Sequence, residues 1–95
     1  MEADVFDWDG SNLRKIKAHG VSTGEVEDAL SRDPILIYEQ EADGEMRYVY
    51  YGETARRRLL AVVLTERDDR IRVITAYGLD AGQKRDYLER RARGE

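Results

Sequence analysis

The stretch LLAVVL at residues 59–64, followed by IRVITA at residues 71–76, decides the fold of this chain. The first stretch is an unbroken apolar run, which is typical of a central strand covered on both faces. In the second, residues two apart share a face. Arg70 and Arg72 are therefore predicted on one face of this strand, pointing outward. The other face, predicted to be the core side, carries Ile71, Val73 and Thr75. Because the connection between the stretches is short and contains the turn pair Asp68-Asp69, we expect an antiparallel hairpin.

Two further strands are predicted before this hairpin, ILIY at residues 35–38 and RYVYY at residues 47–51. The acidic loop between them, residues 39–45, contains the turn pair Asp43-Gly44. Short connections favour an antiparallel meander. VFDW at residues 5–8 is a further β-prone stretch, so the predicted sheet has four to five strands and is mainly antiparallel.

Three helices are predicted from their end signals. The first begins at Ser11-Asn12 and ends at Gly20, a natural C-terminal cap. The second begins at the capping box formed by Ser22 and Glu25 and ends before Pro34. Asp80 caps the third helix, with a glutamine three residues later, and a polar tail follows from about residue 92.

The expected order is therefore β-α-α-β-β-β-β-α in a single domain over residues 1–95. This is an α+β fold, with two N-terminal helices and a C-terminal helix packed against one face of the sheet. Ninety-five residues leave no room for a second core.

The composition narrows the class of protein. There is no cysteine, which excludes disulfides and thiolate metal sites and fits a reducing compartment. No apolar run approaches the ~20 residues of a membrane span, and the acidic start lacks the layout of a signal peptide. We therefore expect a cytoplasmic protein that does not contact membranes.

The net charge of −4 is unevenly distributed along the chain. Residues 1–46 carry 4 Lys and Arg against 12 Asp and Glu, a balance of −8, whereas residues 47–95 carry 12 against 8, a balance of +4. The overall acidity argues against a polybasic nucleic-acid binder but allows a basic patch in the second half. The alternative is a uniformly solvated surface.

No motif for nucleotide, metal or serine-hydrolase chemistry is present, and we expect no cofactor and no metal. Instead, arginines and tyrosines gather on the predicted strands and the last helix, an arrangement that suits single-stranded RNA. RNA cleavage without a metal needs positive charge on the phosphorane and groups that move protons. The catalytic candidates are Arg72 and Arg47 for charge, and His19, Lys84 and Tyr77 for proton transfer or base stacking; the RNA-binding candidates are Tyr51, Arg70, Arg85 and Tyr87.

Each candidate also has a purely structural interpretation. His19 precedes a helix-ending glycine, where an imidazole commonly caps a helix. Arginines on an exposed sheet face pair with acids on neighbouring strands, here Glu66 and Asp68. Tyr87 packs its helix onto the sheet in this interpretation, and residues 56–58, RRR, form a solvated basic loop.

The order of several short motifs resembles the BrnT-type toxins over most of the chain. The matching segments are FDWD at residues 6–9, HGVS at 19–22, GET at 52–54, TER at 65–67 and RIRVITA at 70–76. The resemblance implies a RelE-like fold and a metal-independent ribonuclease that arrests growth. It also implies a ribbon-helix-helix antitoxin as partner, with DNA bound only through the toxin–antitoxin complex.

Two places in the sequence depart from the family pattern. Tyr77 stands where the family usually carries an arginine, and Ala81-Gly82 replaces further basic residues. Lys84 and Arg85 are candidates to supply the missing charge. The alternative function is therefore a catalytically weak or inactive toxin-fold module that acts by binding a protein partner.

Overall fold

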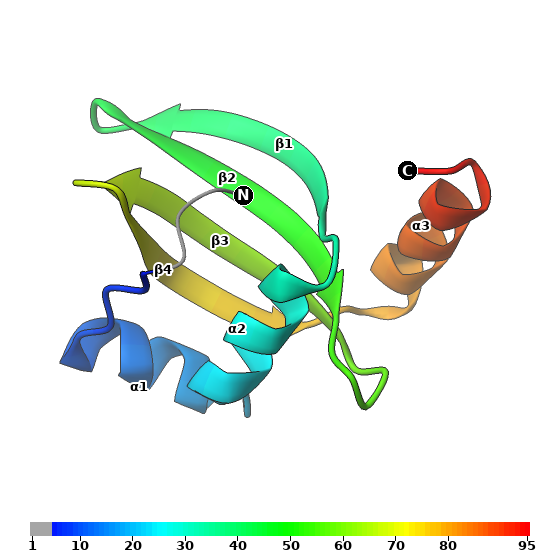
Figure 1. Cartoon of the computed structure of the whole chain (residues 1–95), viewed down its shortest axis with the longest axis horizontal. Coiled ribbons are helices and arrows are strands. Elements are labelled where there is room, and N and C mark those ends of the chain that lie inside the picture. Colours follow the sequence, from blue (N-terminus) through cyan, green and yellow to red (C-terminus); the bar gives the residue numbers. More distant parts are fainter. Residues whose placement is uncertain (1–4) are drawn as a thin grey trace.

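The computed structural model describes residues 5–95, within which a four-stranded antiparallel sheet carries three helices (Figure 1). The elements follow in the order α1 (Gly10–Ala18), α2 (Thr23–Ser31), β1 (Ile35–Ala42), β2 (Glu45–Glu53), β3 (Leu59–Arg67), β4 (Arg70–Gly78) and α3 (Ala81–Ala92). The strands lie in sequence order, β1-β2-β3-β4. The predicted meander and the α+β class are confirmed.

Tight turns fix the register of the β1–β2 and β3–β4 hairpins. Asp43 and Gly44 have φ of 53° and 75°, and Asp68 and Asp69 have φ of 53° and 61°. Two successive residues at positive φ match the right-handed twist of the flanking strands. β1 continues to Ala42, so the loop predicted from residue 39 is shorter than expected. Pairing with β2 extends β1 through residues 39–42, whose mostly polar side chains do not indicate a strand in the sequence.

One face of the sheet is covered by α1 and α2 (Figure 1). Ile16 of α1 and Val26 of α2 pack with Leu60 and Val62 of β3, and all four are almost fully buried. The stripe of apolar residues on each short helix therefore meets alternate residues of the central strand.

The opposite face carries α3, which corrects the expectation that all three helices share one face. Ala61 lies between Leu60 and Val62 on β3, so its side chain points to the other side. There it joins a second apolar cluster that includes Tyr51 of β2 and Tyr87 of α3. Sequence periodicity identifies the buried stripe of a helix but not the sheet face that receives it.

A β-bulge changes the predicted faces of β4. Val63 pairs with Thr75 whereas Leu64 pairs with Val73, so Ile74 is the extra residue. Thr75 therefore lies on the α3 face, and its predicted place beside Val73 is wrong.

The segment predicted as a fifth strand makes only a single parallel bridge, between Phe6 and Ile71. It is held by two backbone hydrogen bonds of 2.8 Å, from Asp7 to Ile71 and from Ile71 to Val5. This segment covers the outer edge of β4 at its first residues.

The helix starts are set by side chains. Asp9, rather than Ser11 or Asn12, caps α1 by accepting a 2.9 Å hydrogen bond from the backbone of Asn12. The predicted capping boxes of α2 and α3 are both confirmed. No helix within residues 5–95 is long and apolar enough to cross a membrane.

Candidate functional site

Polar and cationic side chains gather at both ends of β4. At the first end, Arg72 is held by two carboxylates of the segment that precedes α1. Its Nη2 lies 2.7 Å from Asp9 Oδ2 and its Nη1 lies 3.9 Å from Asp7 Oδ2. The structural interpretation of this arginine is therefore correct in kind, but its partners are not the predicted Glu66 and Asp68.

Arg47 belongs to the same end of the sheet. Arg72 pairs with Thr65, and Tyr48, the neighbour of Arg47, pairs with Leu64, so the two arginines flank Thr65 on one face. Among the described residues, Arg47 Nε is a buried side-chain nitrogen that has no hydrogen-bond partner.

Glu45 provides the local counter-charge at this end. Its carboxylate accepts a hydrogen bond from the Arg67 guanidinium. That bond, together with the charges of Arg67, Arg47 and Arg72, holds the pKa of Glu45 below its usual range. The charges of three guanidinium groups therefore act on this one carboxylate, and Arg67 is the one in contact with it.

At the second end of β4, the ring of Tyr77 meets the ring of His19. Their centroids are 5.9 Å apart and the rings are tilted by 56°. His19 is the C-cap residue of α1, as its structural interpretation predicted, and its side chain is exposed. Gln83 of α3 donates a 3.4 Å hydrogen bond to the Tyr77 hydroxyl, so α1, β4 and α3 meet here.

Arg58 joins the same segments, although the sequence placed it in a solvated loop. Its Nη1 donates to the backbone oxygen of Gly20 at 2.8 Å and to Glu25 Oε2 at 2.9 Å. A Cβ placed on Gly78 would lie 3.7 Å from its Nη2. Arg58 thus reaches the residues that directly follow His19 and Tyr77. In the sequence, the only signal for Arg58 is the run of three arginines at residues 56–58, which does not indicate where any of the three side chains lies.

The Arg58 contact also affects Glu25. The hydrogen bond from Arg58, followed by that from the Ser22 backbone, lowers the pKa of this carboxyl. Glu25 thereby serves two partners, the capping box of α2 and the arginine of the β2–β3 loop.

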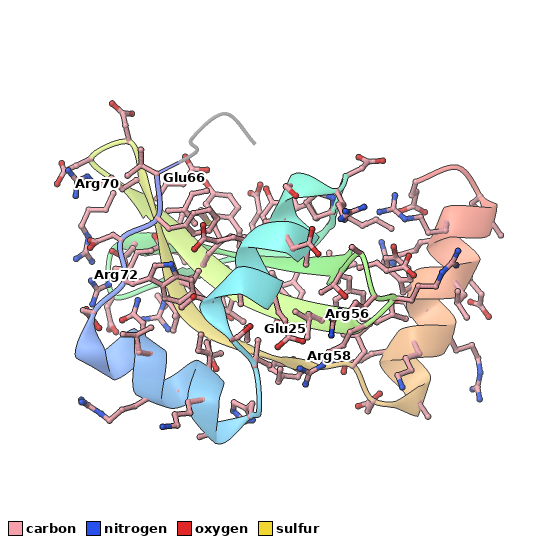
Figure 2. All side chains as sticks on the ribbon, turned by 60° about the horizontal axis from the view of Figure 1, so that its bottom comes forward. Glu25, Arg56, Arg58, Glu66, Arg70 and Arg72 are labelled. Atoms are coloured by element: carbon pink, nitrogen blue, oxygen red, sulfur yellow. The ribbon has the colours of Figure 1, made fainter. Side chains whose placement is uncertain are left out.

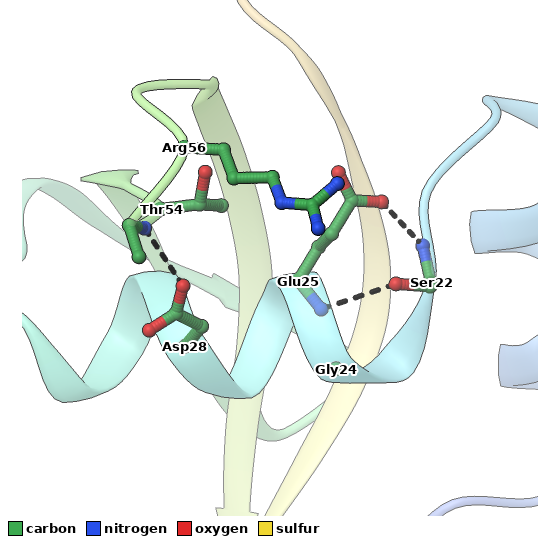
Figure 3. A pocket seen from close by; sticks show the side chains of 7 residues that line it. Ser22, Gly24, Glu25, Asp28, Thr54 and Arg56 are labelled. Atoms are coloured by element: carbon green, nitrogen blue, oxygen red, sulfur yellow. Dashed lines mark hydrogen bonds between the residues drawn. The ribbon is translucent and has the colours of Figure 1, made fainter.

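The loop is also tied to α2 at a second point, which Figure 3 shows from close by. The backbone N–H of Ala55 donates to Asp28 at 2.8 Å, and Arg56 extends over the first turn of α2 toward Glu25. The residues that make these contacts line a shallow hollow between the loop and α2.

The five catalytic candidates do not converge on one point. Tyr77 lies five residues beyond Arg72 on the same strand. Because the bulge at Ile74 adds one residue, this span matches four residues of β3, from Thr65 to Ala61, which is about 13 Å. Arg72 and Arg47 therefore form one group, and His19 and Tyr77 form another, with Lys84 exposed on the first turns of α3. Figure 2 shows Arg70 and Arg72 at one end of the sheet, away from Arg58.

The RNA-binding candidates divide in the same way. Arg70 is exposed near Arg72, and Arg85 is exposed beside Lys84. Tyr51 and Tyr87 are only 7% and 4% exposed. Both rings belong to the apolar cluster between α3 and the sheet, so neither is open to a base. The geometry therefore supports the structural interpretation of Tyr87, in which its ring packs the helix onto the sheet.

No group of three or more His, Cys, Asp or Glu side chains within residues 5–95 is arranged to hold a metal ion.

Comparison with known proteins gives one family. No curated protein and no solved structure shows significant similarity to this chain. The family model of the BrnT ribonuclease toxin of type II toxin–antitoxin systems matches residues 8–81. The match includes α1, α2 and the whole sheet, together with both ends of β4, and it ends at the start of α3. This chain therefore belongs to the BrnT family of ribonuclease toxins of type II toxin–antitoxin systems.

Proposed function

We propose that the chain is a metal-independent endoribonuclease that cleaves RNA to arrest growth. The observation that carries this proposal is the ring pair of His19 and Tyr77 at the end of β4, with Lys84 on the neighbouring helix. An imidazole, a phenol and an ammonium group together supply what RNA cleavage needs in proton transfer and charge.

The reaction joins the ribose 2′-oxygen to the adjacent phosphorus and breaks the bond from phosphorus to the 5′-oxygen. His19 takes the proton of the 2′-hydroxyl, and the Tyr77 hydroxyl, oriented by Gln83, gives a proton to the departing oxygen. The products are a 2′,3′-cyclic phosphate and a 5′-hydroxyl. Lys84 stabilises the negative charge that develops on the phosphorane.

Arg72 and Arg47 have a different role in this scheme because Arg72 lies about 13 Å along the sheet from Tyr77, and Arg47 of β2 lies at the same end as Arg72. They bind phosphates of the same RNA strand farther along β4, with Arg70 beside them. Tyr77 replaces the arginine that the family usually carries, so the phenol combines proton transfer with stacking on a base. Arg85 extends the cationic surface along α3.

The partner in this proposal is an antitoxin of the ribbon-helix-helix type. The acidic first half of the chain, with its balance of −8, suits a basic partner surface. The toxin contacts DNA only through this complex. Since RNA and operator DNA are cytoplasmic in bacteria, the proposal places the complex in the cytoplasm.

A second candidate function is a weakly active or inactive module that acts by protein binding. Its support is the ion pair of Arg72 with Asp9 and Asp7, which occupies a guanidinium that the first proposal reserves for phosphate. The two functions differ in one measurable property, which is RNA cleavage.

The experiment is the integrity of total RNA in cells that express the chain without an antitoxin. The wild type is compared with His19→Gln, Tyr77→Phe and Arg72→Ala, and thermal unfolding of each purified protein serves as the control for folding. We expect cleavage by the wild type, a severe loss in His19→Gln and Tyr77→Phe, and a smaller loss in Arg72→Ala. Intact RNA with folded wild-type protein would support the binding module instead.

A further inference from the structure

A second concave surface lies beside the His19–Tyr77 pair, between the β2–β3 loop, the end of β4 and the first turns of α3. We call it the cationic hollow. It is lined by Arg57, Arg58, Leu59, Gly78, Leu79 and Lys84. Three of these residues are cationic, none is anionic, and the remaining three give it an apolar floor.

The loop that carries the two arginines is held in one conformation. Thr54 is 6% exposed and makes three hydrogen bonds across the loop: its N–H donates to Arg58 O at 2.9 Å, its carbonyl accepts from Arg57 N–H at 2.9 Å, and its Oγ1 accepts from Arg58 N–H at 3.1 Å. Arg57 has φ of 67°, a left-handed conformation that costs free energy for a residue with a side chain. The surrounding hydrogen bonds therefore impose a position that a solvated loop would not adopt.

The charges of the hollow are only partly neutralised. Glu25 pairs with Arg58 at 2.9 Å. Within the described chain, neither Arg57 nor Lys84 has a carboxylate within ion-pair distance. One carboxylate thus faces three cations, and the excess positive charge is open to solvent.

The hollow is continuous with the His19–Tyr77 pair through the backbone. Gly78 lines the hollow and directly follows Tyr77, and Arg58 donates to Gly20, which directly follows His19. The hollow therefore lies directly beside the place that the proposed function gives to the reacting phosphate.

We propose that the cationic hollow binds a phosphate of the RNA strand next to the one that is cleaved. This inference rests on the proposed function and adds a binding site to it. Arg57 holds the phosphate oxygens by charge-assisted hydrogen bonds, and Lys84, which the proposed function assigns to the cleaved phosphate, adds its charge at the edge of the hollow. Arg58, held by Glu25 and Gly20, positions the loop. Leu59 and Leu79 receive the apolar side of the ribose or base.

The test is a binding measurement that requires no cleavage. The probe is a fluorescent single-stranded RNA of about 12 nucleotides, a length within the site sizes of small single-strand binders. Every ribose of the probe is 2′-O-methylated, so the RNA binds without being cleaved. The variant Arg57→Gln removes one charge from the hollow, keeps Lys84 for the proposed cleavage step and leaves the Arg58–Glu25 pair intact. Arg56→Gln is the matched control, because it removes one positive charge from the same loop at an exposed residue that does not line the hollow.

Anisotropy titrations at several salt concentrations give the outcome. We expect severalfold weaker binding by the hollow variant, and a slope of log K against log salt that is shallower by about 0.7 for each phosphate that the variant no longer neutralises. The control changes affinity less and keeps the wild-type slope. Equal affinities and slopes for the two variants would overturn the proposal. Binding of poly-glutamate by the wild-type protein without binding of the RNA would also overturn it.

The same proteins separate this inference from the proposed function. A wild type that binds the RNA with the expected salt dependence but never cleaves natural RNA would overturn the nuclease and keep the hollow. If the wild type cleaves natural RNA but the hollow variant binds the probe as tightly as the wild type does, the nuclease proposal stands and the proposal for the hollow is overturned.

Discussion

The carboxylate of Asp9 joins the start of α1 to β4 by serving Asn12 and Arg72 at once. One oxygen accepts a 2.9 Å hydrogen bond from the backbone of Asn12, and the other lies 2.7 Å from Arg72 Nη2. The first contact caps the helix and the second fixes a guanidinium on the open part of the sheet. A substitution at position 9 can therefore remove the ion pair with Arg72 while the cap of α1 is kept.

Asp9→Asn is expected to keep the cap, because asparagine is as good an N-cap residue as aspartate, while the ion pair with Arg72 is removed. If Arg72 contacts RNA phosphate, its release increases the affinity for single-stranded RNA, which anisotropy measures. Asp9→Ala removes both the cap and the ion pair, so it unfolds at a lower temperature than Asp9→Asn. Lower RNA affinity in Asp9→Asn would contradict a role for Arg72 in phosphate binding.

Acid is expected to destabilise the protein through its paired carboxylates. Hydrogen bonds from partners lower the pKa of Asp9, Glu25, Asp28 and Glu45 in the folded state. Unfolded carboxyls titrate near about pH 4, so the unfolded chain takes up protons first as the pH falls. The stabilisation is therefore present above about pH 5 and is lost as the pH falls through the lower folded values.

Urea denaturation at pH 7, 5, 4 and 3 measures this loss. The double variant Glu25→Gln/Asp28→Asn removes two of the four groups, and its free energy of unfolding is expected to fall less steeply below pH 5. A slope equal to that of the wild type would show that these two pairs do not contribute to acid sensitivity.

Much of the fold was predictable because it depends on contacts that are short in sequence. The capping box of Ser22 and Glu25 spans three residues, and the Asp68-Asp69 turn is defined by its own backbone. Hydrophobic alternation then identified the strands. The lengths of the strands were less accurate, since pairing with a neighbour extends a strand beyond its apolar residues.

The candidate site was less predictable because its contacts are long in sequence. Arg58 binds Gly20 and Glu25, which lie 38 and 33 residues away. The bulge at Ile74 has no glycine or proline to mark it. Sequence reasoning found His19 and Tyr77 separately, but only the folded chain shows that their rings meet, and that Arg72 lies at the other end of β4.

Gly52 is expected to resist substitution because α2 crosses β2 at this point. A Cβ on Gly52 would lie 2.9 Å from the carbonyl oxygen of Ala29 and 3.2 Å from its Cβ. Gly52→Ala therefore forces α2 away from the sheet and costs about 1–3 kcal/mol. The measurement is the free energy of unfolding in urea.

Gly24→Ala is the matched control for this substitution. Gly24 lies in the first turn of α2, where an added Cβ meets only Ser22 Oγ at 3.9 Å. Alanine is favoured over glycine in a helix, so this variant is expected to gain up to about 1 kcal/mol. Similar losses in both variants would contradict the close approach of α2 to β2.

Asn12 is the buried polar residue that connects α1 to β4, and its loss is expected to destabilise the protein. It is 4% exposed, and its side-chain amide donates a hydrogen bond to the backbone oxygen of Val73. Asn12→Ala leaves this buried carbonyl without its donor, at a cost of about 1–3 kcal/mol in the free energy of unfolding.

The Asn12 bond also lies one residue before the bulge at Ile74, so its loss has a local consequence. Backbone amides of β4 around residue 74 are expected to exchange with deuterium faster in Asn12→Ala, whereas amides of β1 keep their wild-type rates. Ser11→Ala is the control, since Ser11 is exposed on the same helix turn. Uniformly faster exchange in all four strands would mean that Asn12 supports the whole fold rather than the bulged part of β4.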